Sequence, residues 1–328
     1  MYVKAYTSGD EEDILILFQE VFGKPMDMQF WKWRYKENPY GEGIIRLMYE
    51  KDKLIGHYAV IPLPLWLKGR IENAAFSMTT MTHPNYGRQG IFTRLASEVY
   101  STCNSLGIKI VFGFPNKNSY YGLTNRLDWL GLGQIQYWEK KGYLDLDYLR
   151  EDFYCNEISY FRDKSDILWE ELKWNCSVIV PRNSKFLNWR YIENPWNEYV
   201  IYAVEDKKEA FQGYIVLKIF QSELDDVGQI VDIFVVPNSN AIVALIKKAF
   251  EFFRNNNVSV ITIWNSELNH INKVLLKLGF LRKKWVGFDS KEWPTYFGIK
   301  IINYSDQKIE ITKMLDNWYL MMGDSDVF

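Results

Sequence analysis

The fold of this chain is decided by residues 79–92, which read Thr-Thr-Met-Thr-His-Pro-Asn-Tyr-Gly-Arg-Gln-Gly-Ile-Phe. The β-branched run at the start of this stretch predicts a strand, and Pro84 ends it. A short Gly/Arg/Gln loop then leads into a helix near Thr93. A helix that begins after such a loop presents unpaired backbone N–H groups and the positive end of its dipole. The stretch therefore predicts an anion site, for which a pyrophosphate is a typical occupant.

A second strand, turn and helix follow directly. Gly107 marks the end of the helix that begins near residue 91. Residues 108–114 form a short apolar run of strand type, and the Pro-Asn-Lys-Asn-Ser turn at 115–119 leads into a helix that ends near Leu127. The two halves together predict two neighbouring strands that each run through a polar loop into a helix.

In this order the two halves resemble the acetyl-CoA site of the GNAT acetyltransferases. The family's loop reads Arg/Gln-x-x-Gly-x-Gly/Ala, and Gly90 matches its central glycine, whereas Gly87 and Phe92 depart from its first and last positions. The resemblance implies that a pantetheine arm lies between the two strands and that the loop binds the pyrophosphate. The residues that it assigns to acetyl-CoA are Thr80, Met81, Thr82, Gly87, Arg88, Gln89, Gly90, Ile91, Phe92, Asn116 and Asn118.

The resemblance also implies direct attack of an amine on the thioester, which needs an acid and a base but no covalent nucleophile. The family often takes its acid from a Tyr four residues before the glycine of a Leu-Gly-Phe turn. Here that turn is Leu-Asp-Trp at 127–129, and Thr124 holds the Tyr position. Tyr121, one turn earlier, is the substitute acid, with a packed aromatic as the alternative. His57 is the candidate base because of its suitable pKa, with a histidine hydrogen-bonded in place as the alternative.

Two carboxylates near the end of the sequence are candidates for binding the acceptor. Asp324 and Asp326 form a small acidic cluster that would hold a cationic amine, and a solvated chain end is the alternative. We expect no metal, because no His, Cys and carboxylate cluster has ligand spacing.

Composition limits the function classes. The 328 residues suffice for two domains, and 39 basic against 41 acidic residues give a net charge of −2, so we expect neither nucleic acid nor an anionic membrane as partner. Three cysteines without metal spacing suit a reducing cytoplasm, and no apolar run is long enough to span a bilayer. Aromatic residues make up 17% of the chain, a surplus that would suit a sugar as ligand.

An internal repeat sets the domain count. Residues 30–39 recur as residues 186–195, at an offset of 156, with seven of ten positions identical. We therefore expect an α/β (α+β) fold of two tandem GNAT-like domains, residues 1–147 and 148–328, each a mixed, mostly antiparallel sheet flanked by helices. After Pro237 the second copy has neither glycine nor arginine, which indicates a degenerate copy that has lost the cofactor and contributes to the acceptor site.

The repeat and the hydrophobic pattern also place the remaining elements. They predict one strand over residues 54–67 and a final strand of the first unit over 134–144. The segment from residue 309 to 326 is too apolar for a free tail, so we expect it to pack on the body of the protein.

The sequence thus predicts an N-acetyltransferase that moves an acetyl group from acetyl-CoA, used as a co-substrate, to a primary amine of a small acceptor such as an amino sugar. Two alternatives stay open. One is a module that binds acyl-CoA or another protein without turnover, which the departures from the family pattern favour. The other is an aminoacyl-tRNA-dependent peptidyltransferase, against which the lack of a basic stripe argues.

Overall fold

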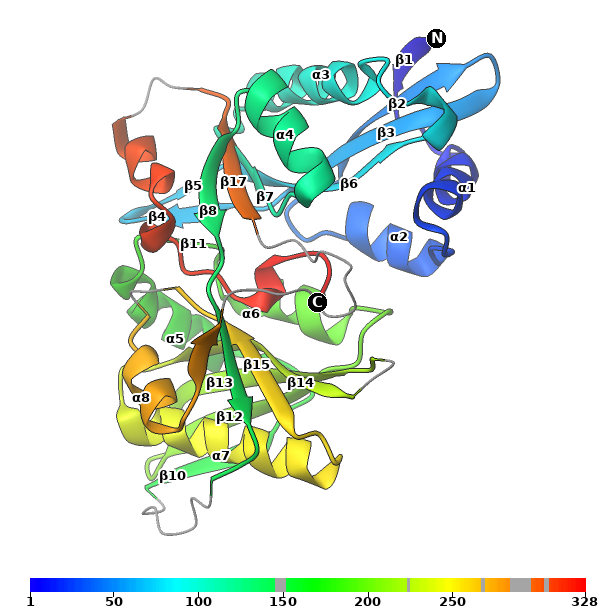
Figure 1. Cartoon of the computed structure of the whole chain (residues 1–328). Helices are drawn as coiled ribbons and strands as arrows, with labels where there is room; N and C mark the ends of the chain where they lie inside the picture. Colours follow the sequence, from blue (N-terminus) through cyan, green and yellow to red (C-terminus); the bar gives the residue numbers. More distant parts are fainter. Residues whose placement is uncertain (145–151, 223–224, 267–268, 284–295, 304–306) are drawn as a thin grey trace. The chain divides into compact units, whose positions relative to one another are not determined.

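The chain forms two compact units. We describe a computed structural model that covers residues 1–144, 152–222, 225–266, 269–283, 296–303 and 307–328. Unit 1 comprises residues 1–133 and 292–313, and unit 2 comprises residues 134–291 and 314–328 (Figure 1). Each unit is built on its own seven-stranded sheet.

The sheet of unit 1 has the order β1-β2-β3-β6-β7-β17-β8. Its strands are β1 (Tyr2–Ala5), β2 (Ile44–Glu50), β3 (Lys53–Pro62), β6 (Ala74–Thr82), β7 (Ile110–Gly113), β17 (Tyr296–Ile301) and β8 (Leu130–Gln134). A short hairpin, β4 (Leu65–Leu67) and β5 (Arg70–Glu72), lies between β3 and β6 in the chain. Strands β6 and β7 pair in parallel. The pairs β1–β2, β2–β3, β3–β6 and β7–β17 are antiparallel.

Helices cover both faces of this sheet. Helices α3 (Ile91–Ser105) and α4 (Lys117–Arg126) lie on one face, and α1 (Glu11–Phe22) and α2 (Met28–Tyr35) lie on the other (Figure 1). The apolar side of α3 joins the core through residues such as Leu95 and Val99, which are fully buried. Close packing of α3 on β3 depends on Gly56, because a Cβ there would lie 2.4 Å from a methyl group of Ile91.

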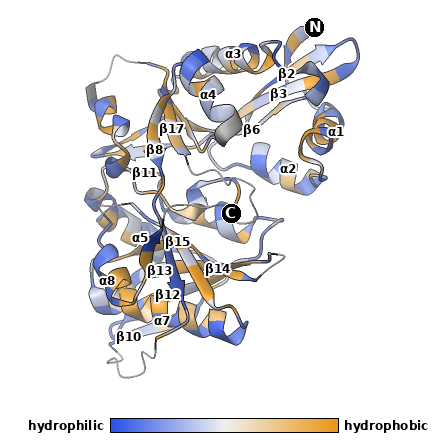
Figure 2. Ribbon diagram, viewed as in Figure 1, coloured by the Kyte–Doolittle hydropathy of each residue, from blue (hydrophilic) through white to orange (hydrophobic). Residues whose placement is uncertain are grey.

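The sheet of unit 2 has the order β10-β12-β13-β14-β15-β9-β16. Its strands are β10 (Phe153–Glu157), β12 (Val200–Asp206), β13 (Phe211–Phe220), β14 (Val227–Val235), β15 (Val260–Trp264), β9 (Tyr137–Lys141) and β16 (Leu281–Lys283). Figure 2 shows β15 as an apolar strand, as expected for a strand buried inside a sheet. The helices are α5 (Asp163–Leu172), α6 (Ser184–Leu187), which continues as the π-turn η3 (Asn188–Ile192), α7 (Ser239–Asn255) and α8 (Asn272–Lys277).

The structure confirms the expected fold class of two α/β units with mixed sheets. It also shows the repeat, because residues 30–39 begin within α2 and residues 186–195 begin within the helical segment α6–η3. The apolar end of the chain packs on unit 2, as expected, and Trp318 and Met321 are no more than 1% exposed. Within the described residues, no helix is both long and apolar enough to cross a membrane.

Two expected strands differ from those observed. The strand expected over 54–67 ends at Pro62 and resumes as β4, because Leu63 and Pro64 interrupt it. The strand expected over 134–144 is two strands, of which β8 belongs to the first sheet and β9 to the second.

The units are therefore not contiguous in sequence, in contrast to the expected domains of residues 1–147 and 148–328. Strand β9 pairs with β15 over residues 137–141, and β17, which follows most of unit 2 in the chain, pairs with β7. Such long-range pairings leave no mark on local periodicity, which reports only whether a segment is a strand. The expected boundary itself falls in residues 145–151, outside the described part of the chain.

Candidate active site in unit 1

The two central strands of unit 1, β6 and β7, pair over only three residues and then separate. Strand β6 pairs with β7 only through Ala74–Phe76 and Ile110–Phe112, although β6 runs on to Thr82. From Ser77 onward, the described ladders give the β7-facing edge of β6 no partner strand. The backbone of Thr80, Met81 and Thr82 lies on this open part, so its N–H and C=O groups are placed to bind an extended ligand.

The loop that follows β6 leaves the start of α3 uncapped. After the turn η1 (Pro84–Tyr86), Gly87, Arg88, Gln89 and Gly90 are all exposed. Arg88 and Gly90 have φ angles of 63° and 75°, a left-handed conformation that brings neighbouring N–H groups to one side. Gly90 is the N-cap of α3, and it has no side chain that could accept a hydrogen bond from the first turn. The loop therefore offers backbone donors and a helix dipole to an anion.

Ile91 and Phe92 contribute their backbone rather than their side chains to this surface. Ile91 is 3% exposed and belongs to the core. The ring of Phe92 packs 5.8 Å from the ring of Tyr58. The departure of Phe92 from the small residue of the family pattern is thus absorbed by packing, and the helix N-terminus stays open.

The second copy of this loop is closed. Pro237 is followed at once by the N-cap Asn238, whereas five residues lie between Pro84 and the N-cap Gly90. The Asn238 Oδ1 accepts hydrogen bonds from the N–H groups of Asn240 at 2.9 Å and Ala241 at 3.4 Å. The first-turn donors that α3 leaves open are therefore used internally in α7.

The turn after β7 supplies a structural cap. Asn116 is the N-cap of α4, and its Oδ1 accepts a hydrogen bond from the N–H of Ser119 at 3.0 Å. The side chain of Asn118 lies outside the described part of the structure. Tyr121 is on α4 and 63% exposed, and Thr124, at the family's acid position, donates to the carbonyl of Tyr120.

His57 is completely buried on β3, opposite Met81 of β6. Its Nδ1 lies 2.8 Å from the carbonyl oxygen of Thr79, and because a carbonyl only accepts, we assign the proton to Nδ1. Nε2 then carries the lone pair, and it has no hydrogen-bond partner among the described residues. Burial lowers the pKa of this imidazole to about 4, so it is neutral at pH 7.

The backbone around His57 is strained. Thr79 has a φ of 49°, which is unusual for a β-branched residue, and the register of β3 and β6 shifts at this point. The ring of Tyr35, from α2, meets the imidazole edge-on at 6.1 Å. A strained residue such as Thr79, bonded to a neutral histidine that has only one of its two ring nitrogens hydrogen-bonded, is typical of a functional site.

The two acidic candidates, Asp324 and Asp326, belong to unit 2. Asp324 is 3% exposed and bonds to the guanidinium of Arg182 through both carboxylate oxygens. Because the guanidinium of Arg182 neutralises this carboxylate, Asp324 is not available to bind an amine. Asp326 is half-buried two residues further on.

The sequence did not predict one buried hydrogen-bond network in unit 1. The indole of Trp129 donates to the Tyr100 hydroxyl at 2.8 Å, which lies 2.9 Å from the hydroxyl of Tyr58, itself 2.9 Å from Ser77 Oγ. Tyr100, Tyr58 and Ser77 come from α3, β3 and β6, and Trp129 comes from the turn before β8, so no spacing in the sequence could have revealed them. The network fixes Ser77, the first residue of β6 beyond its pairing with β7.

Comparisons with known proteins agree with this geometry. Residues 2–129 match the family model described as acetyltransferase (GNAT) domain. Unit 1 contains a GNAT domain. Among curated proteins, no match to the chain was found. Within the described residues, no group of side chains could hold a metal ion.

Solved structures extend the similarity to both units. A GCN5-related N-acetyltransferase from Anabaena variabilis aligns with a TM-score of 0.70 at 14% identity, over 92% of this chain and 73% of that one. A probable N-acyltransferase from Enterococcus faecalis aligns with a TM-score of 0.71 at 12% identity, over 94% and 74%. A tandem GNAT protein from the clavulanic acid biosynthesis pathway aligns with a TM-score of 0.57 at 12% identity, over 93% and 99%. The chain thus has the tandem GNAT fold, and its GNAT domain makes it an acyltransferase.

Proposed function

We propose that the protein is an N-acetyltransferase that transfers an acetyl group from acetyl-CoA to a primary amine, and that unit 1 carries out the reaction. The observation that carries this proposal is the contrast between the two helix N-termini. In α3 the first-turn N–H groups are open and follow two left-handed residues, whereas Asn238 caps α7. Only the first arrangement suits a pyrophosphate.

In this proposal the open edge of β6 holds the pantetheine arm. Backbone N–H groups between Thr80 and Thr82 bind the arm and polarise the thioester carbonyl. Gly87, Arg88, Gln89 and Gly90 surround the pyrophosphate, and the guanidinium of Arg88 adds a positive charge. Unit 2 contributes scaffold without a cofactor.

His57 is the proposed base. As the acceptor amine attacks the thioester carbon, the C–N bond forms, the C–S bond breaks, and Nε2 of His57 takes the proton that the nitrogen loses. The Nδ1–H bond to Thr79 holds the imidazole in the tautomer that this step needs. The thiolate of coenzyme A regains a proton, for which Tyr121 is the proposed donor. An amino sugar is one acceptor of this class.

A binding module without turnover is the second candidate. It is favoured by the side chains around the family's acid position, since Thr124 is bonded to its own helix and Tyr121 is 63% exposed. A protein of this kind would bind acetyl-CoA and release no free thiol with any amine.

Release of coenzyme A thiol, followed with a thiol reagent in the presence of a panel of primary amines and amino sugars, tests the proposal. We expect turnover with at least one amine, and a fall in kcat of about 10²–10⁴ in His57→Asn. Asn is the matched substitution, because its amide can replace the Nδ1–H donor but offers no base. Binding of acetyl-CoA without thiol release would favour the module. Unchanged kcat in His57→Asn would remove His57 from the reaction.

A further inference from the structure

The end of the chain is held in unit 2 by side chains rather than by a ladder. Residues 315–328 contain two single turns, η6 (Leu315–Asn317) and η7 (Met322–Asp324), and Trp318 forms an isolated parallel bridge with Val178. Even so, residues 318–325 are all buried. We call residues 314–328 the tail segment.

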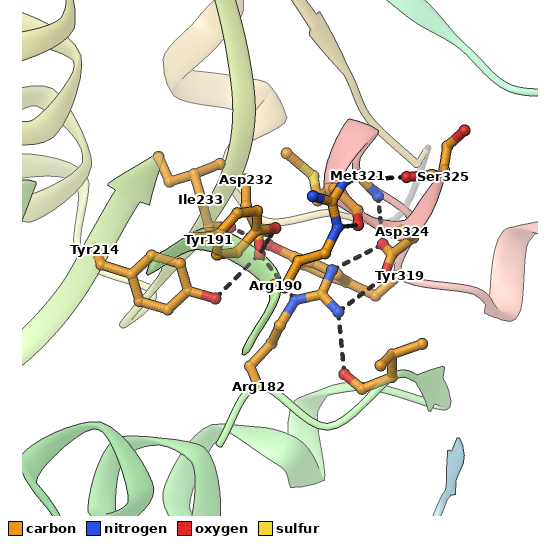
Figure 3. Close-up of polar contacts among 12 residues, drawn as sticks. Arg182, Arg190, Tyr191, Tyr214, Asp232, Ile233, Tyr319, Met321, Asp324 and Ser325 are labelled. Carbon is orange, nitrogen blue, oxygen red and sulfur yellow. Dashed lines mark hydrogen bonds and ion pairs between the residues drawn. The ribbon is translucent and has the colours of Figure 1, made fainter. Parts of the chain in front are cut away.

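A buried carboxylate anchors this segment (Figure 3). Asp324 Oδ1 and Oδ2 accept hydrogen bonds from Arg182 at 2.8 and 2.7 Å. The same guanidinium pairs with Asp232 at 3.0 Å, and the hydroxyls of Tyr191 and Tyr214 donate to Asp232 at 2.9 and 3.1 Å. Burial and the nearby Asp324 charge raise the pKa of Asp232, and Arg182 opposes this shift. Asp324 thus supplies a counter-charge that the buried Arg182 guanidinium requires.

A second guanidinium, that of Arg190, donates hydrogen bonds to backbone carbonyls of the tail segment. Arg190 Nε donates to the carbonyl of Gly323 at 2.9 Å, and Nη2 donates to the carbonyls of Ser325 at 3.0 Å and Phe328 at 2.7 Å. With Arg182, Asp232 and Asp324, it forms a cluster of two positive and two negative groups that are all buried. Recognition of one acidic side chain plus successive main-chain carbonyls is how a protein binds a peptide.

The tail segment lies where the central strands of unit 2 separate. Strand β14 pairs with β15 only from Val227 to Ile230, and beyond that point the Tyr319 hydroxyl donates to the carbonyl of Ile233. The ring of Phe328 packs 4.8 Å from Trp264 at the end of β15. The segment therefore fills the opening between the two strands.

This opening corresponds to the His57 site of unit 1. Tyr214 pairs with Phe234 three residues before Pro237, just as His57 pairs with Met81 three residues before Pro84. The repeat likewise aligns Tyr191 with Tyr35 and Arg182 with Met26. The charged anchor is thus a property of the second copy, since Met26 has no charge to offer.

We propose that unit 2 is a peptide-binding module that the chain fills with its own tail segment, and that its ligand class is a peptide with one acidic side chain placed on Arg182 and its backbone placed on Arg190. The module differs from the acyltransferase site in residues and in ligand. It stands whether or not unit 1 transfers acetyl groups.

The test exchanges the tail segment in the full protein. A protease recognition sequence is inserted between Lys313 and Met314, where unit 1 ends and a 61% exposed residue begins the segment. After cleavage, the nicked protein is titrated into a fluorescein-labelled peptide of residues 314–328, and anisotropy is measured. We expect saturable binding at one peptide per chain, in competition with the unlabelled peptide.

Two peptide variants decide the mode of binding, and neither affects folding of the protein. Asp324→Asn removes the charge that Arg182 requires, and we expect it to weaken binding by at least about 100-fold, as for one partner lost from a buried ion pair. Asp316→Asn, at an exposed position of the same segment, should bind like the parent peptide. Equal binding of the two variants would overturn the proposal. So would failure of the segment to exchange without unfolding of unit 2.

Discussion

The protonation of His57 gives the sharpest prediction about the site in unit 1. Burial lowers its pKa from 6.5 to about 4, so at pH 5 only about one molecule in ten is protonated in the folded protein. The same histidine in the unfolded chain would be almost fully protonated at this pH. Because the unfolded state binds the proton first, the stability from this group is complete above pH 6.5 and falls as the pH is lowered toward 4.

The size of this effect follows from the two pKa values. Between pH 8 and pH 5 the folded protein should lose about 2 kcal/mol through His57 alone, at about 1.4 kcal/mol for each pKa unit crossed. His57→Asn should lose this component, since its amide does not titrate. The difference between the two proteins in free energy of unfolding, measured with urea at pH 8 and pH 5, isolates the term.

The assay that reads His57 directly is NMR of protein labelled at histidine. The chain has three histidines, at positions 57, 83 and 270, so single substitutions assign all the signals. We expect the His57 ring to remain neutral at pH 5 and its nitrogen shifts to show Nδ1 protonated. A titration near pH 6.5, or a proton on Nε2, would refute the assignment of Nε2 as the free base.

Three further substitutions test the packing and capping by urea denaturation. Gly56→Ala places a methyl group against Ile91 and should cost about 1–3 kcal/mol, and together with Ile91→Ala it should cost less than the sum of the two separate losses. Tyr100→Phe leaves the buried indole N–H of Trp129 unsatisfied and should cost about 1–3 kcal/mol; no loss would mean that water replaces the hydroxyl. Asn238→Ala removes the cap of α7 and should cost about 1 kcal/mol, and an unchanged midpoint would contradict its role.

The local elements could be predicted from the sequence because local patterns encode them. The strand and helix around Gly90 and the repeated helix at 30–39 and 186–195 lie where periodicity and turn residues place them. The exchange of β9 and β17 between the sheets could not be foreseen, since pairing of distant strands depends on tertiary contacts. The prediction of one strand over residues 54–67 was wrong at Pro64, although a proline in a strand was a visible signal against it.

The candidate site also has features that the sequence predicted and features that it did not. The loop around Gly90 was visible because left-handed φ angles favour glycine, and its position before a helix has one main use. The environment of His57 was not visible, because the Thr79 carbonyl that fixes its tautomer is a backbone atom. Asp324 was assigned to a ligand because its partner Arg182 lies 142 residues away in the chain.

Calorimetric titration with acetyl-CoA tests the central claim most directly. The wild-type protein should bind one acetyl-CoA per chain, and Gly90→Trp should abolish binding, because an indole at the N-cap of α3 blocks the open N–H groups. Asn240→Trp, in the first turn of α7, is the matched control and should bind like the wild type. No binding by the wild type, or loss of binding only in the α7 variant, would contradict the assignment of the acetyl-CoA site to unit 1.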